Sequence, residues 1–355
     1  MAAVRIALFD QVNEVHVCVA LSMALQSIGH EVHVTDAVWQ GHRLATHAED
    51  VARIDRAVDE VLAAGCGALL NFRASALSAA QVARLRRAGV ATAVWLPDDP
   101  VLYGVTYRHV VDAYDHVLHC GGLPILEFYT RQGHQVGVNF PFWVDPARWA
   151  HAWRPQNTRG DLVFVGNLHG PAKRGRYERL ASAHARLSVY GICPDDPLAM
   201  HRGELHGVDA LCAVLPLFRA GLNLPQRFAE YAGSAYDFAG LAELGGFELP
   251  SRVVQYAALG LPIITLDELP SNRAFPHSLQ APDMGTALQL ADALAADPDA
   301  ALDLSRRARA EVESHFSAAS RARFLTALLS GGVVVSAMSA DARATCYRQY
   351  PGNHP

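Results

Sequence analysis

The chain has 355 residues, of which 51% are hydrophobic and 18% charged, and this length corresponds to a little over two domains of average size. Its 30 basic and 35 acidic residues give a formal charge of −5, which offers no net positive field, so we expect no nucleic-acid partner. Asp10 and Glu14 interrupt the apolar start, which argues against a signal peptide, and the uncharged stretch 324–340 is short for a membrane span. We therefore expect a cytoplasmic protein without a membrane span.

The first half of the chain alternates short apolar runs with amphipathic segments. Strands are predicted at residues 4–9, 31–35, 68–72, 92–96, 116–120 and 135–140. Helices are predicted at residues 15–28, 49–64, 78–88 and 124–132, and a glycine directly follows each of them. Strands joined by crossover helices run parallel, so this half predicts a doubly wound parallel sheet. Two prolines break the pattern within residues 141–146 and mark a domain boundary.

The same alternation restarts in the second half. Strands are predicted at 161–166, 187–191, 220–224 and 261–265, and helices at 173–187, 251–259, 284–296, 300–315 and 318–329. Ser251 is expected to cap the helix 251–259, which Gly260 and Pro262 end. We therefore predict an α/β chain with two Rossmann-like, doubly wound parallel-sheet domains, residues 1–145 and 146–315. A C-terminal helix and a mobile tail are expected to make up residues 316–355.

In open parallel sheets, ligands bind beyond the carboxyl ends of the strands, so the turns that follow strands are the candidate sites. The turn after the first strand contains no glycine, which argues against a nicotinamide or flavin cofactor. Its polar residues Asp10, Asn13 and Glu14 either contact an acceptor molecule or form a solvated loop. We expect no bound metal, because the scattered acids and the six separate cysteines form no ligand cluster in the sequence.

Two adjacent carboxylates, Asp98 and Asp99, directly follow the strand 92–96 on a turn with a proline at each end. Either can act as a general base toward a hydroxyl group or bind sugar hydroxyls, and either can equally be a turn or helix-capping residue. His119 ends the next predicted strand and is a further candidate base, with a structural role as the alternative.

Basic residues at two helix starts of the second half predict an anion site. The strand 161–166 ends at Gly166, and Asn167 follows it. The next predicted helix carries Lys173, Arg174 and Arg176 in its first turn. Basic residues oppose the helix dipole at this end, whereas a diphosphate would bind both the helix amides and the guanidinium groups.

The second basic helix start is at Arg252, in the first turn of the helix 251–259. Gln255 and Tyr256 follow three and four residues later and therefore share one face with Arg252. This spacing suits a phosphate bound by Arg252 and a ribose hydroxyl bound by Gln255. By itself the spacing is a weak signal, and the other basic turn strengthens it.

Several of these segments resemble the GT-B glycosyltransferases, and within them the bacterial group of spore-maturation glycosyltransferase-like proteins. The likeness covers most of the chain. It rests on residues 95–100 (WLPDDP), on the FVG of 164–166 with Arg176 downstream, on Asn223 within GLNLP, and on residues 251–265, where an arginine-bearing helix is followed by Gly-Leu-Pro and a strand. The family's acid at the position of Gln255 is an amide here.

The resemblance implies a metal-independent transfer of a sugar from a nucleoside diphosphate to an acceptor, without a further cofactor. Because the sequence has neither a membrane helix nor a basic amphipathic segment, we expect a small soluble acceptor such as a natural-product intermediate. By the resemblance, the final helix from Ala318 would cross back toward the first domain, which would bind this acceptor. The second would bind the nucleotide sugar, through Gly166, Asn167, Lys173, Arg174, Arg176, Asn223, Ser251, Arg252 and Gln255. Two alternatives share the architecture, a nucleotide-sugar 2-epimerase and a non-catalytic nucleotide- or glycan-binding relative.

Overall fold

The computed structural model divides the chain into two compact units. Unit 1 consists of Met1–Phe142, Ala235–Leu244 and Ser317–Pro355, and unit 2 of Trp143–Ser234 and Gly245–Phe316. The residues described are 3–9, 15–35, 39, 41–149, 153–168, 175, 178, 180, 185–192, 200–266 and 275–352. Among them, no helix combines the length and the apolar character needed to cross a membrane.

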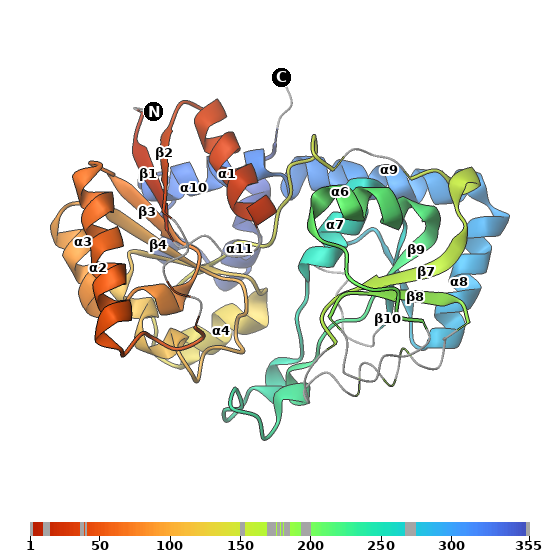
Figure 1. The fold of residues 1–355 in the computed structure, drawn as a ribbon, viewed down its shortest axis with the longest axis horizontal. Helices are drawn as coiled ribbons and strands as arrows, with labels where there is room; N and C mark the ends of the chain where they lie inside the picture. The colour runs from red at the N-terminus through yellow and green to blue at the C-terminus, as the bar shows by residue number, and fades with distance from the viewer. Residues whose placement is uncertain are drawn as a thin grey trace. The chain divides into compact units, whose positions relative to one another are not determined.

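The described strands of unit 1 form one all-parallel sheet (Figure 1). They are β1 (Arg5–Phe9), β2 (Glu31–Val34), β3 (Ala68–Asn71), β4 (Ala91–Leu96), β5 (His116–His119) and β6 (Val138–Asn139), and their order is β2-β1-β3-β4-β5-β6. The strand order reverses between β1 and β3. All strands predicted for this half are therefore present, with ends shifted by a few residues, because fully buried parallel strands appear in the sequence as short apolar runs.

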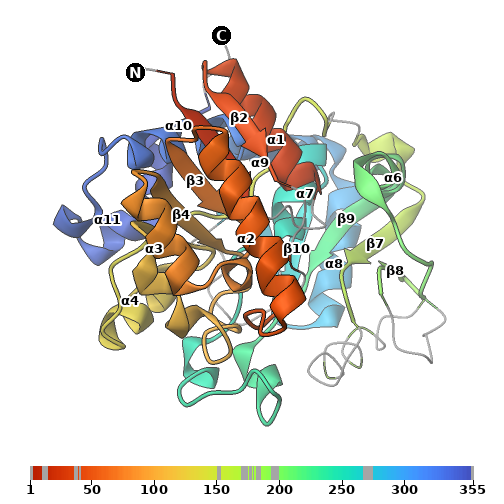
Figure 2. The same cartoon turned by 60° about the vertical axis from the view of Figure 1, so that its left-hand side comes forward.

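Helices cover both faces of this sheet. They are α1 (Val15–Ser27), α2 (Ala48–Ala63), α3 (Ala79–Arg87), α4 (Leu123–Arg131), α10 (Ala318–Leu329) and α11 (Ala340–Thr345). Figures 1 and 2 show α2 and α3 on one face, while α1 packs against α10 on the other. The right-handed rule for parallel crossovers requires this split, because the chain moves one way from β1 to β2 and the other way from β2 to β3.

The C-terminal segment Ser317–Pro355 belongs to unit 1, although it is distant in sequence from the strands of the sheet. Residues after 332 carry weak signals and were expected to be mobile, but α11 packs against α4 and β6, and Tyr347 is buried. The Asn139 side chain of β6 donates a hydrogen bond to the Ala344 carbonyl oxygen at 3.1 Å. The tail up to Gly352 is therefore an ordered part of unit 1, and not the loose end that its composition predicts.

Unit 2 contains a second all-parallel sheet. Its described strands are β7 (Gly160–Val165), β8 (Leu187–Tyr190), β9 (Phe218–Asn223), β10 (Ile263–Leu266) and β11 (Ser278–Ala281), in the order β11-β10-β9-β7-β8. The order reverses between β7 and β9. Val163 pairs with Gly221, so Val165 and Asn223 lie at the same level, where these two strands end.

The described helices of unit 2 are α6 (Gly207–Val214), α7 (Ser251–Leu259), α8 (Met284–Ala296) and α9 (Pro298–His315). The helix α6 and the strand β11 are not predicted from the sequence, because both are short and carry weak periodicity. The core joins the sheet to α8, through residues such as Phe164, Leu222, Ile264 and Ala287, all fully buried.

The start of α7 differs from the prediction. Pro250 is the N-cap residue, in an extended conformation with φ −69° and ψ 151°, and Ser251 is the first helical residue. No side chain caps this end, so the predicted capping role of Ser251 is wrong. The C-terminal end is as expected, since Gly260 adopts the left-handed conformation with φ 72°.

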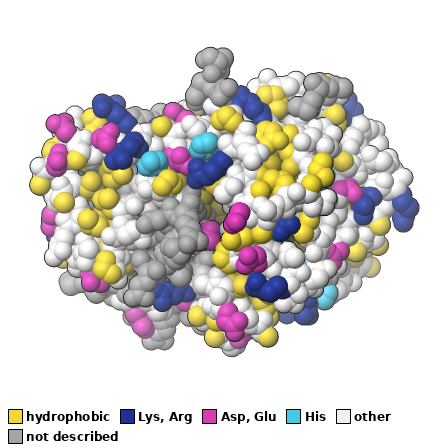
Figure 3. All heavy atoms as spheres, turned by 180° about the vertical axis from the view of Figure 1, so that it is seen from behind, with side chains coloured by type: hydrophobic (Ala, Val, Ile, Leu, Met, Phe, Trp, Pro, Cys, Tyr) yellow, Lys and Arg dark blue, Asp and Glu magenta, His cyan; other side chains and the backbone are white. Residues whose placement is uncertain are grey.

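Basic and acidic side chains are interspersed among the described residues of the face drawn in Figure 3. This distribution agrees with the small net charge of −5.

Candidate functional site

The helix α7 is held unusually close to the sheet of unit 2. A Cβ atom at Gly221 would lie 2.5 Å from the Tyr256 ring, so only glycine allows this ring to lie against β9. The Tyr256 hydroxyl then accepts a hydrogen bond of 2.9 Å from the Val165 amide at the end of β7. Burial raises the pKa of Tyr256 to about 12, which keeps this hydroxyl protonated. These contacts fix the first turn of α7 over the carboxyl ends of β7 and β9.

Arg252 extends from that first turn across the end of the sheet. Its Nε donates to the Val165 carbonyl at 2.9 Å, and its Nη1 donates to the Leu224 carbonyl at 3.1 Å and to Asn223 Oδ1 at 3.3 Å. The guanidinium carbon lies 4.9 Å from the centre of the Phe164 ring, within the range of a cation–π contact. The strand ends therefore hold the guanidinium group on several sides.

No carboxylate pairs with Arg252 among the residues that the structure describes, and every acceptor named above is neutral. Burial lowers the pKa of the Arg252 guanidinium, but the ordinary pKa of arginine is so high that the group remains charged at neutral pH. An uncompensated cation at the positive end of a helix attracts an anion. The point where strand order reverses is also where open α/β sheets bind their ligands.

Gly166 follows β7 and lies beside the remaining nitrogen of Arg252. A Cβ atom there would be 3.2 Å from Nη2 and 3.0 Å from the Phe164 ring, so the absence of a side chain leaves this nitrogen uncrowded. Asn223 has a positioning role, because its Oδ1 accepts from Arg252 and its Nδ2 donates to Thr265 Oγ1 at 3.3 Å.

The other predicted nucleotide-site residues are distributed as follows. Asn167 is exposed just after Gly166, Ser251 is half-buried at the start of α7, and Gln255 is buried one turn after Arg252. Lys173, Arg174 and Arg176 lie outside the described residues. The sequence predicts no site role for Phe164 or for the Leu224 carbonyl, although both lie within segments that carry predicted site residues.

In unit 1, the adjacent aspartates Asp98 and Asp99 have opposite environments. Asp99 is 1% exposed, and its Oδ2 lies 2.5 Å from His119 Nδ1, while its Oδ1 accepts a hydrogen bond of 2.7 Å from the Tyr129 hydroxyl. Burial, and next the charge of Asp99, raise the pKa of Tyr129, so this hydroxyl remains a donor. The His119 Nε2 is also buried, and Gly137 lies so close that a Cβ atom there would overlap this nitrogen. The side chains of Asp99 and His119 are therefore enclosed in this structure.

Asp98 is exposed and lines a cavity of about 170 Å³ at the carboxyl ends of β3 and β4. The cavity is lined by His42, Phe72, Arg73, Ala74, Ser75, Pro97, Asp98, Leu102 and Tyr107. Arg73 follows β3 as Asp98 follows β4, so the rule about strand ends could have found it. The predicted acceptor residues Asp10, Asn13 and Glu14 lie outside the described residues.

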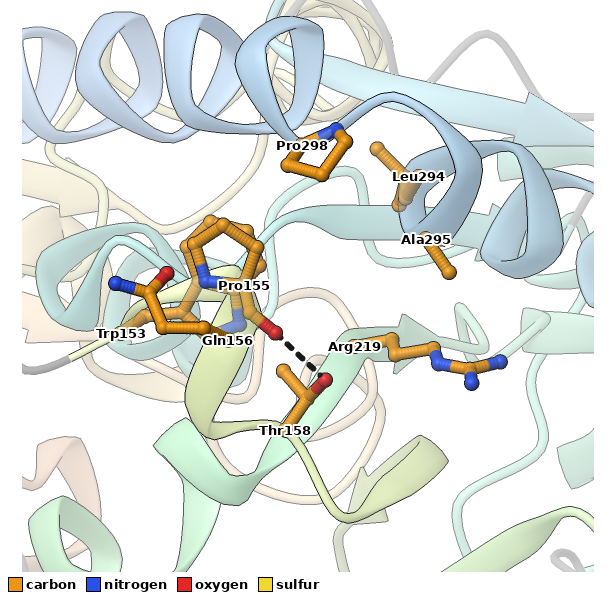
Figure 4. A pocket seen from close by; sticks show the side chains of 8 residues that line it. All are labelled: Trp153, Pro155, Gln156, Thr158, Arg219, Leu294, Ala295 and Pro298. Atoms are coloured by element: carbon orange, nitrogen blue, oxygen red, sulfur yellow. Dashed lines mark hydrogen bonds between the residues drawn. The ribbon is translucent and has the colours of Figure 1, made fainter.

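A larger cavity of about 290 Å³ in unit 2 contains none of the predicted site residues (Figure 4). It is lined by Trp153, Pro155, Gln156, Thr158, Arg219, Leu294, Ala295 and Pro298. Arg219 is the second residue of β9, so this cavity lies near the amino ends of the strands. Arg252, in contrast, lies at their carboxyl ends. The Arg219 guanidinium group already pairs with Asp161 at 2.6 Å.

No protein-family model matches the chain, and no curated protein matches it. Solved structures resemble it over most of its length. The N-terminal domain of a trehalose-6-phosphate phosphatase from Candida albicans has a TM-score of 0.61 at 9% identity, covering 94% of this chain and 98% of that one. A sucrose-phosphate synthase from Thermosynechococcus elongatus has a TM-score of 0.58 at 12% identity, covering 92% and 98%.

A third structure is a putative UDP-N-acetylglucosamine 2-epimerase from Listeria monocytogenes, with a TM-score of 0.56 at 12% identity and coverage of 93% and 97%. At such identities the likeness concerns the fold. Two all-parallel α/β units in one chain, similar over their length to these proteins, have the GT-B fold. The predicted fold class is therefore confirmed.

Proposed function

We propose that this chain is a glycosyltransferase that moves a sugar from a nucleoside diphosphate to an acceptor. The observation that carries the proposal is Arg252, a cation with no carboxylate partner among the described residues, which neutral oxygens hold at the point where the sheet of unit 2 reverses its strand order. Transfer of the sugar leaves a nucleoside diphosphate with increased negative charge. Positive groups held in place before the reaction stabilise that charge without reorganising.

In this proposal the leaving diphosphate lies against Arg252 and the amino-terminal end of α7. These groups supply the positive charge, so the mechanism requires no metal ion. Lys173, Arg174 and Arg176 are proposed as further diphosphate contacts, and Gln255 as a contact to the ribose. Gly166, Asn167 and Ser251 would approach the diphosphate through their backbone.

Asp98 is the proposed base for the acceptor. Of the three predicted catalytic residues, Asp98 is exposed and lines a cavity, whereas Asp99 and His119 are enclosed. If the reaction inverts the sugar, the Asp98 carboxylate takes the proton from the attacking hydroxyl or amine. The cavity of about 170 Å³ is smaller than a site for a drug-sized ligand, so it would take one ring or one arm of a small acceptor.

The acceptor class that we propose is a small molecule such as a natural-product intermediate. A similar structure, AviGT4, is described as a glycosyltransferase involved in avilamycin A biosynthesis, with a TM-score of 0.53 at 16% identity and coverage of 92% and 98%. The second candidate function is a nucleotide-sugar 2-epimerase, favoured by the comparable TM-score of 0.56 of the Listeria structure.

Calorimetry with UDP, dTDP and GDP tests the nucleotide site. We expect one of them to bind the wild type, and Arg252→Ala to weaken binding at least about tenfold, or about 1.4 kcal/mol. Arg306→Ala is the matched control, because Arg306 is an exposed arginine of α9. Arg252→Lys keeps the charge without the forked geometry and should also bind more weakly. Unchanged affinity in a folded Arg252→Ala variant would remove this residue from the site.

Product analysis then separates the function classes. The protein is incubated with UDP-, dTDP- and GDP-sugars, first alone and then with a panel of hydroxyl and amine acceptors. A glycosylated acceptor supports the transferase, and Asp98→Asn should then slow transfer with little effect on nucleotide affinity. An epimerised sugar formed without acceptor would establish the epimerase instead. Nucleotide binding with neither product would indicate a non-catalytic binder.

A further inference from the structure

The chain between β9 and α7 forms an arm that connects elements of both candidate sites. It leaves β9 after Asn223, which accepts a hydrogen bond from Arg252, and it returns at Pro250, next to the helix that carries Arg252. Its stem belongs to unit 2, whereas its tip, Ala235–Leu244, belongs to unit 1. No motif in the sequence distinguishes this tip from the residues around it.

The stem is held by an antiparallel β-bridge between Arg227 and Gly246. The Phe228 amide donates to the Gly245 carbonyl at 2.8 Å, and the Phe247 amide donates to the Gln226 carbonyl at 3.0 Å. The rings of Phe228 and Phe247 meet edge to face with their centres 5.0 Å apart. Backbone pairing and an aromatic contact thus give the arm a defined geometry.

The tip is anchored in unit 1 by apolar side chains. The Phe238 ring lies 5.2 Å from the Tyr103 ring and 5.6 Å from the Phe128 ring, and Leu241 is fully buried. The short helix Ala242–Leu244 packs against α4, which carries Phe128. The Tyr236 ring lies 5.9 Å from the ring of His42.

Two residues of unit 1 that contact the tip, His42 and Tyr103, are linked to the cavity beside Asp98. His42 lines the cavity directly. Tyr103 closes the turn that begins with the two aspartates, because its amide donates to the Pro100 carbonyl at 2.8 Å. Its ring also meets the Tyr129 ring at 5.2 Å, and Tyr129 in turn donates to Asp99.

We propose that the arm tip positions the cavity beside Asp98: Phe238 holds the Asp98 turn through Tyr103, and Tyr236 holds the wall formed by His42. The segment that leads into the Arg252 helix would thereby also determine the shape of the cavity that selects the acceptor. Phe238 and Tyr236 act here as positioning residues. The catalytic consequence rests on the proposed function, whereas the positioning itself does not.

Hydrogen exchange on the full chain tests the positioning without any substrate. In Phe238→Ala, we expect the amides of Tyr103, Thr106 and Tyr107 to exchange about tenfold faster, because local opening becomes easier when packing is lost. Glu243→Ala is the control, an exposed acid on the same tip. Amides of unit 2 such as Val189 should be unaffected. Unchanged exchange around Asp98 in Phe238→Ala would overturn the proposal.

Kinetics tests the consequence for catalysis, using the acceptor that the panel identifies. Phe238→Ala and Tyr236→Ala should raise the acceptor KM about tenfold while the affinity for the nucleoside diphosphate stays unchanged, and Phe238→Tyr should restore the acceptor KM. An equal loss of nucleotide affinity would contradict a role on the acceptor side. If the wild type transfers no sugar to any acceptor, the proposed function fails, and hydrogen exchange still decides the positioning.

Discussion

Asp98 and Asp99 are neighbours in sequence, but their side chains are suited to different tasks. Asp99 is enclosed with His119 and Tyr129, so its carboxylate is satisfied inside unit 1. Asp98 is exposed at a cavity. A pair of acids after a strand is a useful signal from sequence, but which of the two is exposed depends on side chains brought from β5 and α4.

This difference predicts opposite effects of two substitutions. His119→Ala should lower the free energy of unfolding by about 3–5 kcal/mol, because it leaves the buried Asp99 carboxylate without the one of its two partners that can carry a positive charge. Asp98→Asn should change it by no more than about 0.5 kcal/mol, as expected at an exposed position. Urea denaturation measures both. A stable His119→Ala variant that loses only activity would show instead that His119 acts on the substrate.

At the scale of elements, α7 and the strands beneath it form the proposed nucleotide site. The helix begins at Ser251 without a side-chain cap, and every residue from Val253 to Leu259 is buried. A helix buried all round is positioned by packing. The absence of a Cβ atom at Gly221 is what permits the close approach of Tyr256 to β9.

Gly221→Ala should therefore destabilise unit 2 by about 1–3 kcal/mol, because the new methyl group must displace the Tyr256 ring. The same shift would move Arg252, so nucleotide affinity should fall as well. Gly285→Ala in the first turn of α8 is the control, and it should be neutral or stabilising by up to about 1 kcal/mol. Thermal melts and calorimetry report the two effects. A Gly221→Ala variant with wild-type stability would show that α7 adjusts without cost.

At the scale of the whole molecule, neither unit is a continuous stretch of chain. Unit 1 receives its last segment, Ser317–Pro355, after unit 2 is complete. In that segment α10 packs against α1, and the Phe324 ring stacks on the Phe140 ring with centres 5.8 Å apart. The buried Arg321 donates to the Pro141 carbonyl at 2.9 Å.

A chain ending at residue 316 should consequently have a defective unit 1. Removal of α10 exposes one apolar face of its sheet and the buried side of α1. Hydrogen exchange should show lost protection in β1 and β3, while β7 and β9 remain protected. Full protection of β1 in the shortened chain would show that the C-terminal segment is dispensable for unit 1.

The sequence by itself predicted most of the described strands and longer helices of both units and the parallel character of the two sheets. These follow from local signals, namely apolar runs, helical spacing and the glycines that end helices. The same signals placed Arg252 at a helix start, which is the centre of the proposed nucleotide site. Short elements such as α6, β11 and α11 were missed, because their formation depends on packing rather than on local pattern.

The tertiary structure decided which of these residues meet. The order of β7 and β9 brings Val165 and Asn223 together around Arg252, although the 57 residues 166–222 separate them in the sequence. Packing from β5 and α4 encloses Asp99 and leaves Asp98 exposed. The arm tip joins unit 1 through Phe238 and Leu241, two apolar residues with no local signature. Such contacts depend on the path of the whole chain, and no short stretch of sequence encodes that path.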